Sequence, residues 1–304
     1  MNTMNTKTGS IALMALSLVA CGGGGGGASP SGPVSPDPFS PVSPGAAAPP
    51  PAIPAATTPK PTVDFGRLAF SWLAGSYAGE KCLIRAAFSA NETLQINTDG
   101  IVSLAGASHN FLPAEIGLTK SIDTNGARTL SAGVISRIEA KSPRLQLIWA
   151  DIPTERGYFS MQSPALATPD DMVNGCDSSD GSKLLAKALY PLVEQYIEQL
   201  GQPMLCRNST SINASVNYSV RNGVADINGE SLPLRSGLAL ESLGVRQSSP
   251  TEPRGLTYSA YMPDGRSAVI ELDSSGTPLK AFFQLNNGVA VMCDQNKSAS
   301  TPPV

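Results

Sequence analysis

The sequence predicts an α+β fold that consists of two similar β-rich units, each an antiparallel meander with one packed helix and one disulfide. Three observations lead to this prediction. Short segments alternate between apolar and polar residues, turn-forming dipeptides separate these segments, and two stretches carry apolar residues at helical spacing. We expect each helix to pack on the sheet of its own unit.

The clearest strand signal is the segment 212–220 (INASVNYSV), in which every second residue is apolar. This alternation predicts a strand with one buried face. Weaker alternation predicts strands at 130–138, 145–150, 256–262 and 268–272. Tight hairpin turns are predicted at five dipeptides that tolerate positive φ, namely Asp99-Gly100, Asn125-Gly126, Asn222-Gly223, Asp264-Gly265 and Asn287-Gly288.

Two segments break the alternating pattern and predict helices at 65–73 and 184–200. In the second segment, the apolar residues that share one broad face are Leu185, Leu189, Leu192, Val193, Tyr196, Ile197 and Leu200. Pro191 lies inside this segment, and proline lacks the backbone donor that a helix interior needs. We therefore expect a kink or a fresh start at Pro191.

An internal repeat is predicted from an offset of 124 residues between the two halves. This offset places Cys206 on Cys82, the alternating segment 212–220 on 88–96, and Phe282-Phe283 on Tyr158-Phe159. Cys293-Asp294 matches Cys176-Asp177 after a gap of seven residues. The repeat predicts a first unit at 63–179, a second unit at 180–296 and a disordered tail at 297–304.

Four cysteines lie in these units: Cys82, Cys176, Cys206 and Cys293. Four thiols allow three pairings, and the spacing alone does not choose among them. If each unit closes its own bridge, Cys82 pairs with Cys176 and Cys206 with Cys293. The sequence has one histidine and no CxxC motif, so disulfides are favoured over metal ligation, and no metal or cofactor is expected.

The N-terminus has the layout of an export signal, with a polar start and an apolar run at 11–20 that is too short to span a bilayer. The run ends in Leu18-Val19-Ala20-Cys21, which resembles the lipobox of bacterial lipoproteins. The resemblance implies that residues 1–20 form a signal peptide and that Cys21 becomes the lipid-modified, palmitate-bearing first residue. Because Gly22 rather than aspartate follows Cys21, the resemblance favours the outer membrane over the inner membrane.

A tether is predicted at 21–62. Six glycines follow Cys21, and twelve of the 35 residues from 28 to 62 are proline. Such a segment buries too little apolar surface to offset its ordering entropy, so we expect a disordered linker. Because glycine-rich chain is loose and proline-rich chain is extended, the tether would carry the globular part away from the membrane.

The sequence shows no assembled catalytic constellation. His109, the only candidate base for a Ser-His-Asp site, lies in a polar stretch that reads as an exposed loop. Carboxylate pairs such as Asp151 with Glu155 or Asp226 with Glu230 could serve a glycosidase but are expected to be surface acids. The acidic residues Asp170, Asp171, Asp177 and Asp180 lack calcium-loop spacing and read as a linker between the units.

We expect the following aromatic residues in the core rather than in a ligand groove: Trp72, Trp149, Tyr158, Phe159, Tyr258, Tyr261, Phe282 and Phe283.

The favoured function is a non-enzymatic binding or structural module, anchored to the membrane by the lipid on Cys21. The partner would be an envelope protein or a glycan. The net charge of −3 with scattered Lys and Arg gives no indication of nucleic-acid binding. Two alternatives stay open: an envelope hydrolase that uses paired carboxylates, and a periplasmic inhibitor or chaperone with a tight protein partner.

Overall fold

The structure is a computed structural model of the chain, in which Thr58–Val304 form one compact unit. It describes residues 61–84, 87–137, 143–151, 156–162, 174–201, 204–208, 211–216, 218–246, 254–286 and 288–294. The predicted signal peptide, Cys21, almost all of the tether and the C-terminal tail lie outside these residues. No helix in the described part of the chain is long and apolar enough to cross a membrane.

The elements occur in two successive sets, which we call the first half and the second half. The first half comprises α1 (Phe65–Leu73), β1 (Gly75–Ile84), β2 (Ala87–Ile96), β3 (Ile101–Leu104), β4 (Ala107–Asn110), β5 (Ala114–Ile122), β6 (Arg128–Ser136), β7 (Arg144–Ala150), β8 (Arg156–Gln162) and β9 (Asn174–Ser178). The second half comprises α2 (Ser182–Ala186), the 3₁₀ turn η1 (Tyr190–Leu192), α3 (Glu194–Ile197), the 3₁₀ turn η2 (Glu198–Gly201), β10 (Leu205–Asn208), β11 (Ser211–Ser215), β12 (Tyr218–Arg221), β13 (Val224–Ile227), β14 (Glu230–Pro233), β15 (Leu240–Arg246), β16 (Gly255–Tyr261), β17 (Ser267–Leu272), β18 (Pro278–Gln284) and β19 (Ala290–Asp294).

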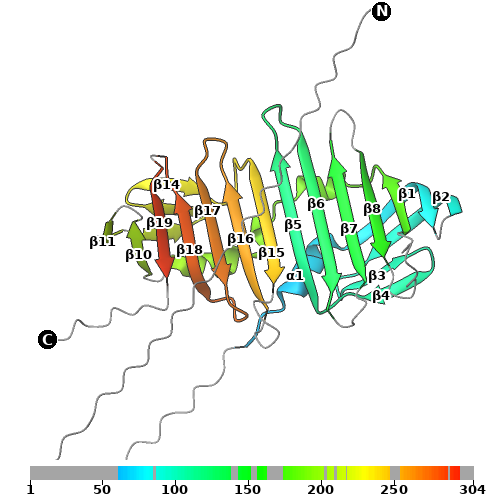
Figure 1. Cartoon of the computed structure of the whole chain (residues 1–304), viewed down its shortest axis with the longest axis horizontal. Coiled ribbons are helices and arrows are strands. Elements are labelled where there is room, and N and C mark those ends of the chain that lie inside the picture. Colours follow the sequence, from blue (N-terminus) through cyan, green and yellow to red (C-terminus); the bar gives the residue numbers. More distant parts are fainter. Residues whose placement is uncertain are drawn as a thin grey trace, which may run out of the picture. The chain divides into compact units, whose positions relative to one another are not determined.

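One antiparallel sheet runs through both halves (Figure 1). Its described strands follow the order β11-β10-β19-β18-β17-β16-β15-β5-β6-β7-β8-β9-β1-β2-β3-β4. The halves meet where β15 pairs with β5, and Leu243 lies opposite Leu118 there. Both leucines are buried, so the two halves share one continuous core.

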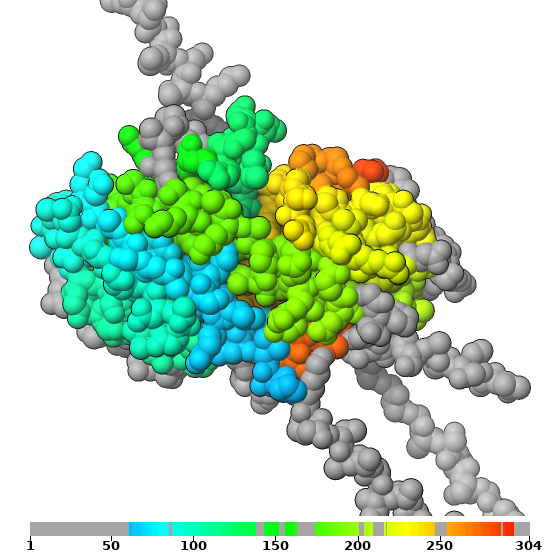
Figure 2. Space-filling model, turned by 180° about the vertical axis from the view of Figure 1, so that it is seen from behind, coloured from blue at the N-terminus to red at the C-terminus, as the bar shows by residue number. Residues whose placement is uncertain are grey.

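The inner face of this sheet is covered by helices and by short strands (Figure 2). From behind, α1, the helical segment 182–201 and the hairpins β12-β13-β14 lie on this side of the sheet. The ring of Tyr218 in β12 lies 5.5 Å from that of Phe283 in β18. The buried core therefore lies between the large sheet and this inner layer.

The helix prediction for 65–73 is confirmed by α1. Asp64 caps it, because its carboxylate accepts a hydrogen bond of 2.8 Å from the backbone N–H of Arg67. The predicted helix at 184–200 is broken into α2, η1, α3 and η2, with Pro191 inside η1. The break agrees with the expected fresh start at the proline.

The second helical segment does not pack only on its own half. α2 contacts β6 of the first half, and α1 contacts both β5 and η1. The expectation of one helix on the sheet of each unit is therefore wrong in this respect. The helices instead form a common layer over the junction of β5 and β15.

The strand predicted at 212–220 is divided into β11 and β12, which belong to different sheets. The other predicted strands are present as β6, β7, β16 and β17. The strand predicted at 130–138 corresponds to β6, and its last residue, Ile138, lies outside the described residues. Positive φ occurs at Gly100, Gly126, Gly223 and Gly265, as the turn dipeptides predict. A further hairpin turn with positive φ, at Asn228-Gly229, joins β13 to β14.

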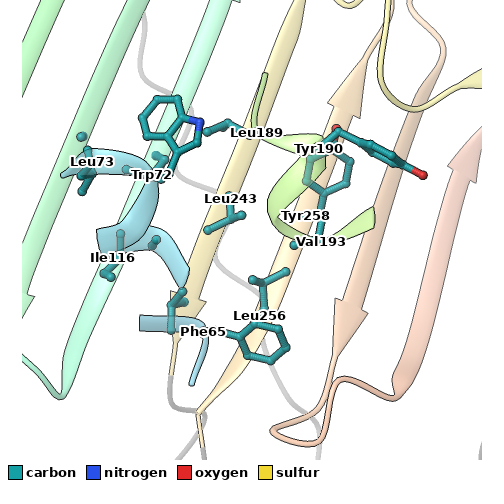
Figure 3. Close-up of a cluster of buried hydrophobic side chains, with 14 of the residues drawn as sticks. Phe65, Trp72, Leu73, Ile116, Leu189, Tyr190, Val193, Leu243, Leu256 and Tyr258 are labelled. Carbon is teal, nitrogen blue, oxygen red and sulfur yellow. The ribbon is translucent and has the colours of Figure 1, made fainter. Parts of the chain in front are cut away.

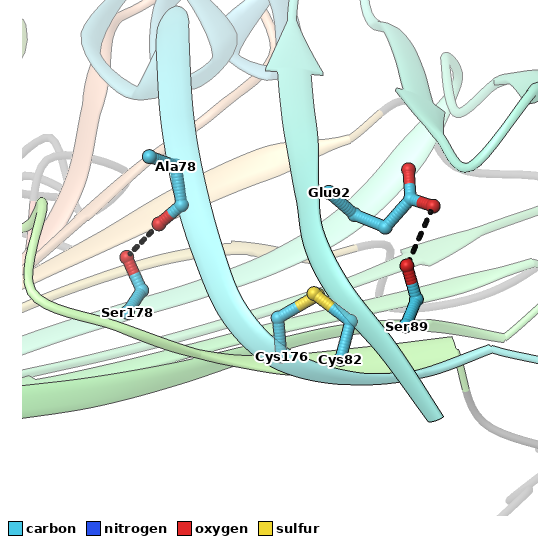
Figure 4. Close-up of a disulfide and its surroundings, with 6 residues drawn as sticks. All are labelled: Ala78, Cys82, Ser89, Glu92, Cys176 and Ser178. Atoms are coloured by element: carbon cyan, nitrogen blue, oxygen red, sulfur yellow. Dashed lines mark hydrogen bonds between the residues drawn. A yellow bond between two sulfur atoms is a disulfide. The ribbon is translucent and has the colours of Figure 1, made fainter. Parts of the chain in front are cut away.

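Each half contains one disulfide. Cys82 in β1 bonds to Cys176 in β9 (Figure 4), and Cys206 in β10 bonds to Cys293 in β19. In both bridges the Cα atoms are 4.0 Å apart, because each disulfide joins neighbouring strands. These pairings are the ones expected if each unit closes its own bridge. A hydrogen bond of 2.7 Å from Ser178 Oγ to the Ala78 carbonyl also ties β9 to β1.

Gly157 in β8 lies against the fully buried ring of Trp149, so its lack of a side chain is required for packing. A Cβ at Gly157 would lie 2.0 Å from Trp149 Cδ1 and 2.4 Å from the carbonyl oxygen of Ile148. We expect Gly157→Ala to lower the free energy of unfolding by about 2–3 kcal/mol, because backbone or indole must shift. Guanidinium chloride unfolding measures this loss.

Gly117 in β5 provides the matched control, because a Cβ there would meet no atom within 4 Å. Gly117→Ala should leave the free energy of unfolding unchanged or raise it by up to about 1 kcal/mol, since alanine restricts the unfolded chain. Equal losses in the two variants would contradict the close packing of Gly157 on Trp149.

Candidate functional site

The face of the large sheet opposite the helical layer is exposed to solvent. On β6 and β7 the inward residues Ala132 and Leu147 are buried, whereas their outward neighbours Ser131 and Gln146 are exposed. Figure 1 shows this outer face in front of the helices. Where the halves meet, the outward residues are small: Gly117, Thr119, Ser131, Ser242, Gly244 and Ser259. The centre of the outer face is therefore flat and polar.

An apolar groove, which we call the outer groove, lies on the same face over β10, β19 and β18. Its volume is about 230 Å³. Met292 is 57% exposed, Leu205 38% and Phe282 36%, and Phe282 lies directly opposite Met292. Three large apolar side chains are thus exposed together on neighbouring strands, which is unusual for a surface without a partner.

Charged residues surround this apolar patch. Arg207 lies opposite Met292 in β10, and Asp294 lies between Leu205 and Lys280 in the strand register. Arg207, Asp294 and Ala290 also line the outer groove. The groove therefore combines an apolar floor with a rim that carries both charges.

The same place in the first half is filled. Positions in the two halves can be compared by counting from the disulfide cysteines, because Phe159 lies opposite Cys176 and Ala281 lies opposite Cys293. The next pair outward is Ser160–Gly175 in the first half and Phe282–Met292 in the second half. A Cβ at Gly175 would lie 2.0 Å from the hydroxyl oxygen of Tyr158. Tyr158 therefore covers this position in the first half, and the second half has an open groove.

On the inner face, several hydrogen bonds hold the helical layer over the junction of the halves. Trp72 Nε1 donates to the carbonyl of Ala188 at 3.2 Å, and Lys187 Nζ donates to the carbonyl of Trp72 at 3.1 Å. From β5, Lys120 Nζ donates to the carbonyl of Leu185 at 2.7 Å and also to that of Lys187. Because these bonds join α1, α2 and β5, neither half is covered independently of the other.

Glu241 in β15 is a buried carboxylate that binds η1 to the sheet. It accepts hydrogen bonds from the N–H groups of Leu189 and Tyr190, at 2.8 Å and 2.5 Å, and from the hydroxyl of Tyr258 at 2.9 Å. Apolar side chains of α1, η1 and the sheet surround this region (Figure 3). Such charge-assisted bonds are stronger than neutral ones, so Glu241 is a principal contact of the helical layer.

Burial raises the pKa of four tyrosines above the ordinary value of 10: Tyr77, Tyr190, Tyr218 and Tyr258. A nearby carboxylate adds to the effect of burial, for example Glu241 beside Tyr258 and Glu198 beside Tyr218. All four hydroxyls belong to the inner side of the fold and are associated with its packing rather than with a cleft on the outer face.

We expect the protein to lose stability as the pH rises above about 10. A tyrosine with a raised pKa keeps its proton in the folded state while the unfolded state releases it, so its contribution is complete below pH 10 and decreases above it. Absorbance at 295 nm, followed together with circular dichroism, should show four of the seven tyrosines ionising only as the fold is lost. Ionisation of all seven in a folded protein would contradict this expectation.

Three of the four carboxylates considered from the sequence, Asp151, Asp226 and Glu230, lie among the described residues, and each has a hydrogen-bond partner. Asp151 binds Arg128 at 2.7 Å, which lowers the pKa of Asp151, and its partner Glu155 lies outside the described residues. Asp226 accepts the Gly229 N–H, and Glu230 accepts the N–H of Asn286 at 2.9 Å. These described carboxylates therefore have structural roles.

The remaining sequence candidates are distributed as follows. His109 lies in strand β4 rather than in a loop, and it is partly buried, so the expectation of an exposed loop histidine is wrong. Of the acidic stretch, Asp170 and Asp171 lie outside the described residues, and Asp180 accepts the Ala78 N–H at 3.3 Å. No group of three or more potential metal ligands occurs among the described residues.

Comparison with known proteins found no matching family model, no matching curated protein and no matching solved structure.

Several residues of these sites were not found from the sequence. The aromatic residues Trp149, Phe159, Tyr258 and Phe283 are buried as expected, but Phe282 and Tyr261 are exposed at 36% and 41%. Leu205 and Met292 have no sequence signal of their own, because their exposure depends on the pairing of β10 with β19. A usable signal for Phe282 was the alternation along β18, which points Phe282 and Phe283 to opposite faces.

Proposed function

We propose that this protein is a lipid-anchored lipoprotein of the bacterial cell envelope that displays a non-enzymatic binding module on a long tether. The anchor is supported by the lipobox-like sequence at Cys21, and Gly22 favours the outer membrane. Two disulfides suit an exported protein, since the cytoplasm keeps most thiols reduced. The Gly- and Pro-rich segment 21–62 would hold the module away from the lipid.

We further propose that the module arose by duplication of one α+β unit, with units at 63–179 and 180–296. Outward from the junction, the first half runs β5-β6-β7-β8-β9-β1-β2 and the second half runs β15-β16-β17-β18-β19-β10-β11. The elements thus follow the same order along the chain and in the sheet. The strand register supports the duplication. From Cys176, the residues directly opposite one another on successive strands lead to Leu118 in β5, and from Cys293 they lead to Leu243 in β15. Leu118 and Leu243 lie opposite each other where the halves meet.

The binding role rests on the outer groove. A helical layer and short strands cover the inner face of the sheet, whereas the outer face has an exposed apolar groove at Leu205, Phe282 and Met292. The first half has Ser160 and Gly175 in place of Phe282 and Met292, and Tyr158 fills the space. If the halves are duplicates, the groove is a specialised feature of the second half rather than a consequence of the fold.

An envelope protein is the partner that this groove fits best. Phe, Met and Arg are enriched in protein–protein interfaces, and a rim with both charges matches a mixed-charge protein surface better than a neutral glycan. The described carboxylates considered for hydrolysis hold backbone or arginine groups instead, which supports a binding module over the hydrolase alternative.

Site-specific photo-crosslinking in intact cells tests this proposal. A benzoylphenylalanine at position 292 of the full chain should give one discrete adduct with another envelope protein, and Phe282→Ser should abolish the adduct. The matched control is position 148, since Ile148 is also an outward apolar residue, 42% exposed, on the first half.

Three results would contradict the proposal. The benzoylphenylalanine at position 292 could give no adduct, or it could give the same adducts as the benzoylphenylalanine at position 148. It could also link only to a second copy of this chain. The last result would make the outer groove a self-association surface.

A further inference from the structure

A second cavity lies on the inner side of the sheet, beside the junction of β5 and β15 and next to α2; we call it the seam pocket. Its volume is about 280 Å³. The first half contributes Lys120, Ser121 and Arg128 to its lining, and the second half contributes Arg235 and Ser236. The pocket is therefore built by both halves and lies on the opposite face from the outer groove.

Three cationic side chains line this pocket, and each keeps donors that no described residue accepts. Lys120 gives two hydrogen bonds to the carbonyls of Leu185 and Lys187, and an ammonium has three protons. Arg128 binds Asp151 through Nε at 2.7 Å, which leaves its two terminal nitrogens available. Within the described part of the chain, the one ion pair of Arg235 is with Glu194 at 3.5 Å, and its side chain is 55% exposed.

Among the described residues that line the pocket, the one acid is Glu241, and its oxygens are already used as acceptors. Its two oxygens already accept three hydrogen bonds from Leu189, Tyr190 and Tyr258, on the side of the helical layer. Burial lowers the pKa of Lys120; Glu241 opposes this effect and Arg128 adds to it. The pocket thus holds a half-buried ammonium close to a guanidinium of like charge.

We propose that the seam pocket binds an oxyanion group, the carboxylate or phosphate of a small solute. Partial burial disfavours the charged ammonium of Lys120, and a bound anion beside it would stabilise that charge. Arginine donors are arranged for two parallel bonds to a carboxylate or phosphate, and the exposed hydroxyl of Ser236 in the pocket lining supplies a neutral donor. A volume of about 280 Å³ accommodates a solute of this kind.

This site is independent of the outer groove and of the lipid anchor. It needs only the folded part of the chain, so the failure of either proposal leaves the other testable.

Isothermal titration calorimetry of the full chain tests the proposal, with inorganic phosphate in one arm and citrate in the other, each at constant ionic strength set by sodium chloride. We expect saturable binding at one site per chain in at least one arm, and that arm identifies the preferred group. The double variant Arg128→Gln with Arg235→Gln should bind at least about tenfold more weakly, because each lost guanidinium contact is charge-assisted.

The matched control is Arg144→Gln with Arg246→Gln, which removes the same charge from two exposed residues of β7 and β15 on the outer face. It should bind as the unaltered chain does. If loss of the Arg128–Asp151 pair disturbs folding, the single variant Arg235→Gln replaces the double variant, because the side chain of Arg235 is exposed. This single variant should weaken binding about threefold or more. Absence of saturable binding in both arms, or equal weakening in both double variants, would overturn the proposal.

Discussion

Replacing Cys206 and Cys293 together by serine is expected to lower the free energy of unfolding by up to about 4.5 kcal/mol. The bridge closes a loop of 87 residues, and the chain-entropy relation gives this value as an upper bound for a loop of that size. Equilibrium unfolding in guanidinium chloride under non-reducing conditions measures the loss.

The companion pair Cys82→Ser with Cys176→Ser is the control for position, since its loop of 94 residues predicts a loss of similar size. Because one sheet and one helical layer span both halves, either change should lower the midpoint of a single transition. A loss below about 1 kcal/mol, or two separate transitions that each respond to one bridge, would contradict a shared core.

Glu241→Ala is expected to lower the free energy of unfolding by about 3 kcal/mol or more. The change leaves the N–H groups of Leu189 and Tyr190 without their acceptor in a buried place. The Tyr258 hydroxyl keeps the Leu234 carbonyl as an acceptor, at 2.6 Å. Glu241→Gln should also destabilise, because one side-chain oxygen cannot replace two and the new amide faces donors. Thermal and denaturant unfolding give the size of the loss.

Hydrogen exchange localises the effect of Glu241. The amides of residues 189 and 190 should lose protection more than those of β7, because η1 would detach from β15 first. Glu271→Ala, an exposed acid of β17 on the outer face, is the matched control and should change the free energy of unfolding by less than about 0.5 kcal/mol. Unchanged protection at 189 and 190 in Glu241→Ala would show that this carboxylate does not hold the helical layer.

Local patterns predicted much of the secondary structure. Alternation identified β7, β16 and β17, the apolar spacing identified α1, and Pro191 marked the break in the second helical segment. These features depend on neighbouring residues, which explains why the sequence alone reveals them. The segment 212–220 was mispredicted as one strand because its alternation continues across the point at which the chain leaves β11 and enters β12 of the other sheet.

The sites depend on long-range pairing and were not predictable in the same way. Met292 becomes part of a groove only because β19 pairs with β10, which is far away in the sequence, as well as with the preceding strand β18. Lys120, Glu241 and Arg235 resemble surface charges until β15 pairs with β5 and the helical segment crosses the junction. The offset of 124 residues aligned Cys206 with Cys82, and it also aligned Phe283 with Phe159. In the structure, Phe159 lies opposite Cys176 and Ala281 lies opposite Cys293, so the strand register aligns Phe159 with Ala281 instead.

The lipid anchor is tested by the mass of the N-terminal peptide, from protein purified from its native membrane without reduction. We expect the chain to begin at Cys21, with a diacylglycerol group on the sulfur of this residue and an acylated amine. Cys21→Ser, the matched control, should leave the protein out of the membrane fraction. A native chain that begins before or after Cys21, or one that carries an unmodified Cys21, would contradict the lipid anchor and with it display from the membrane.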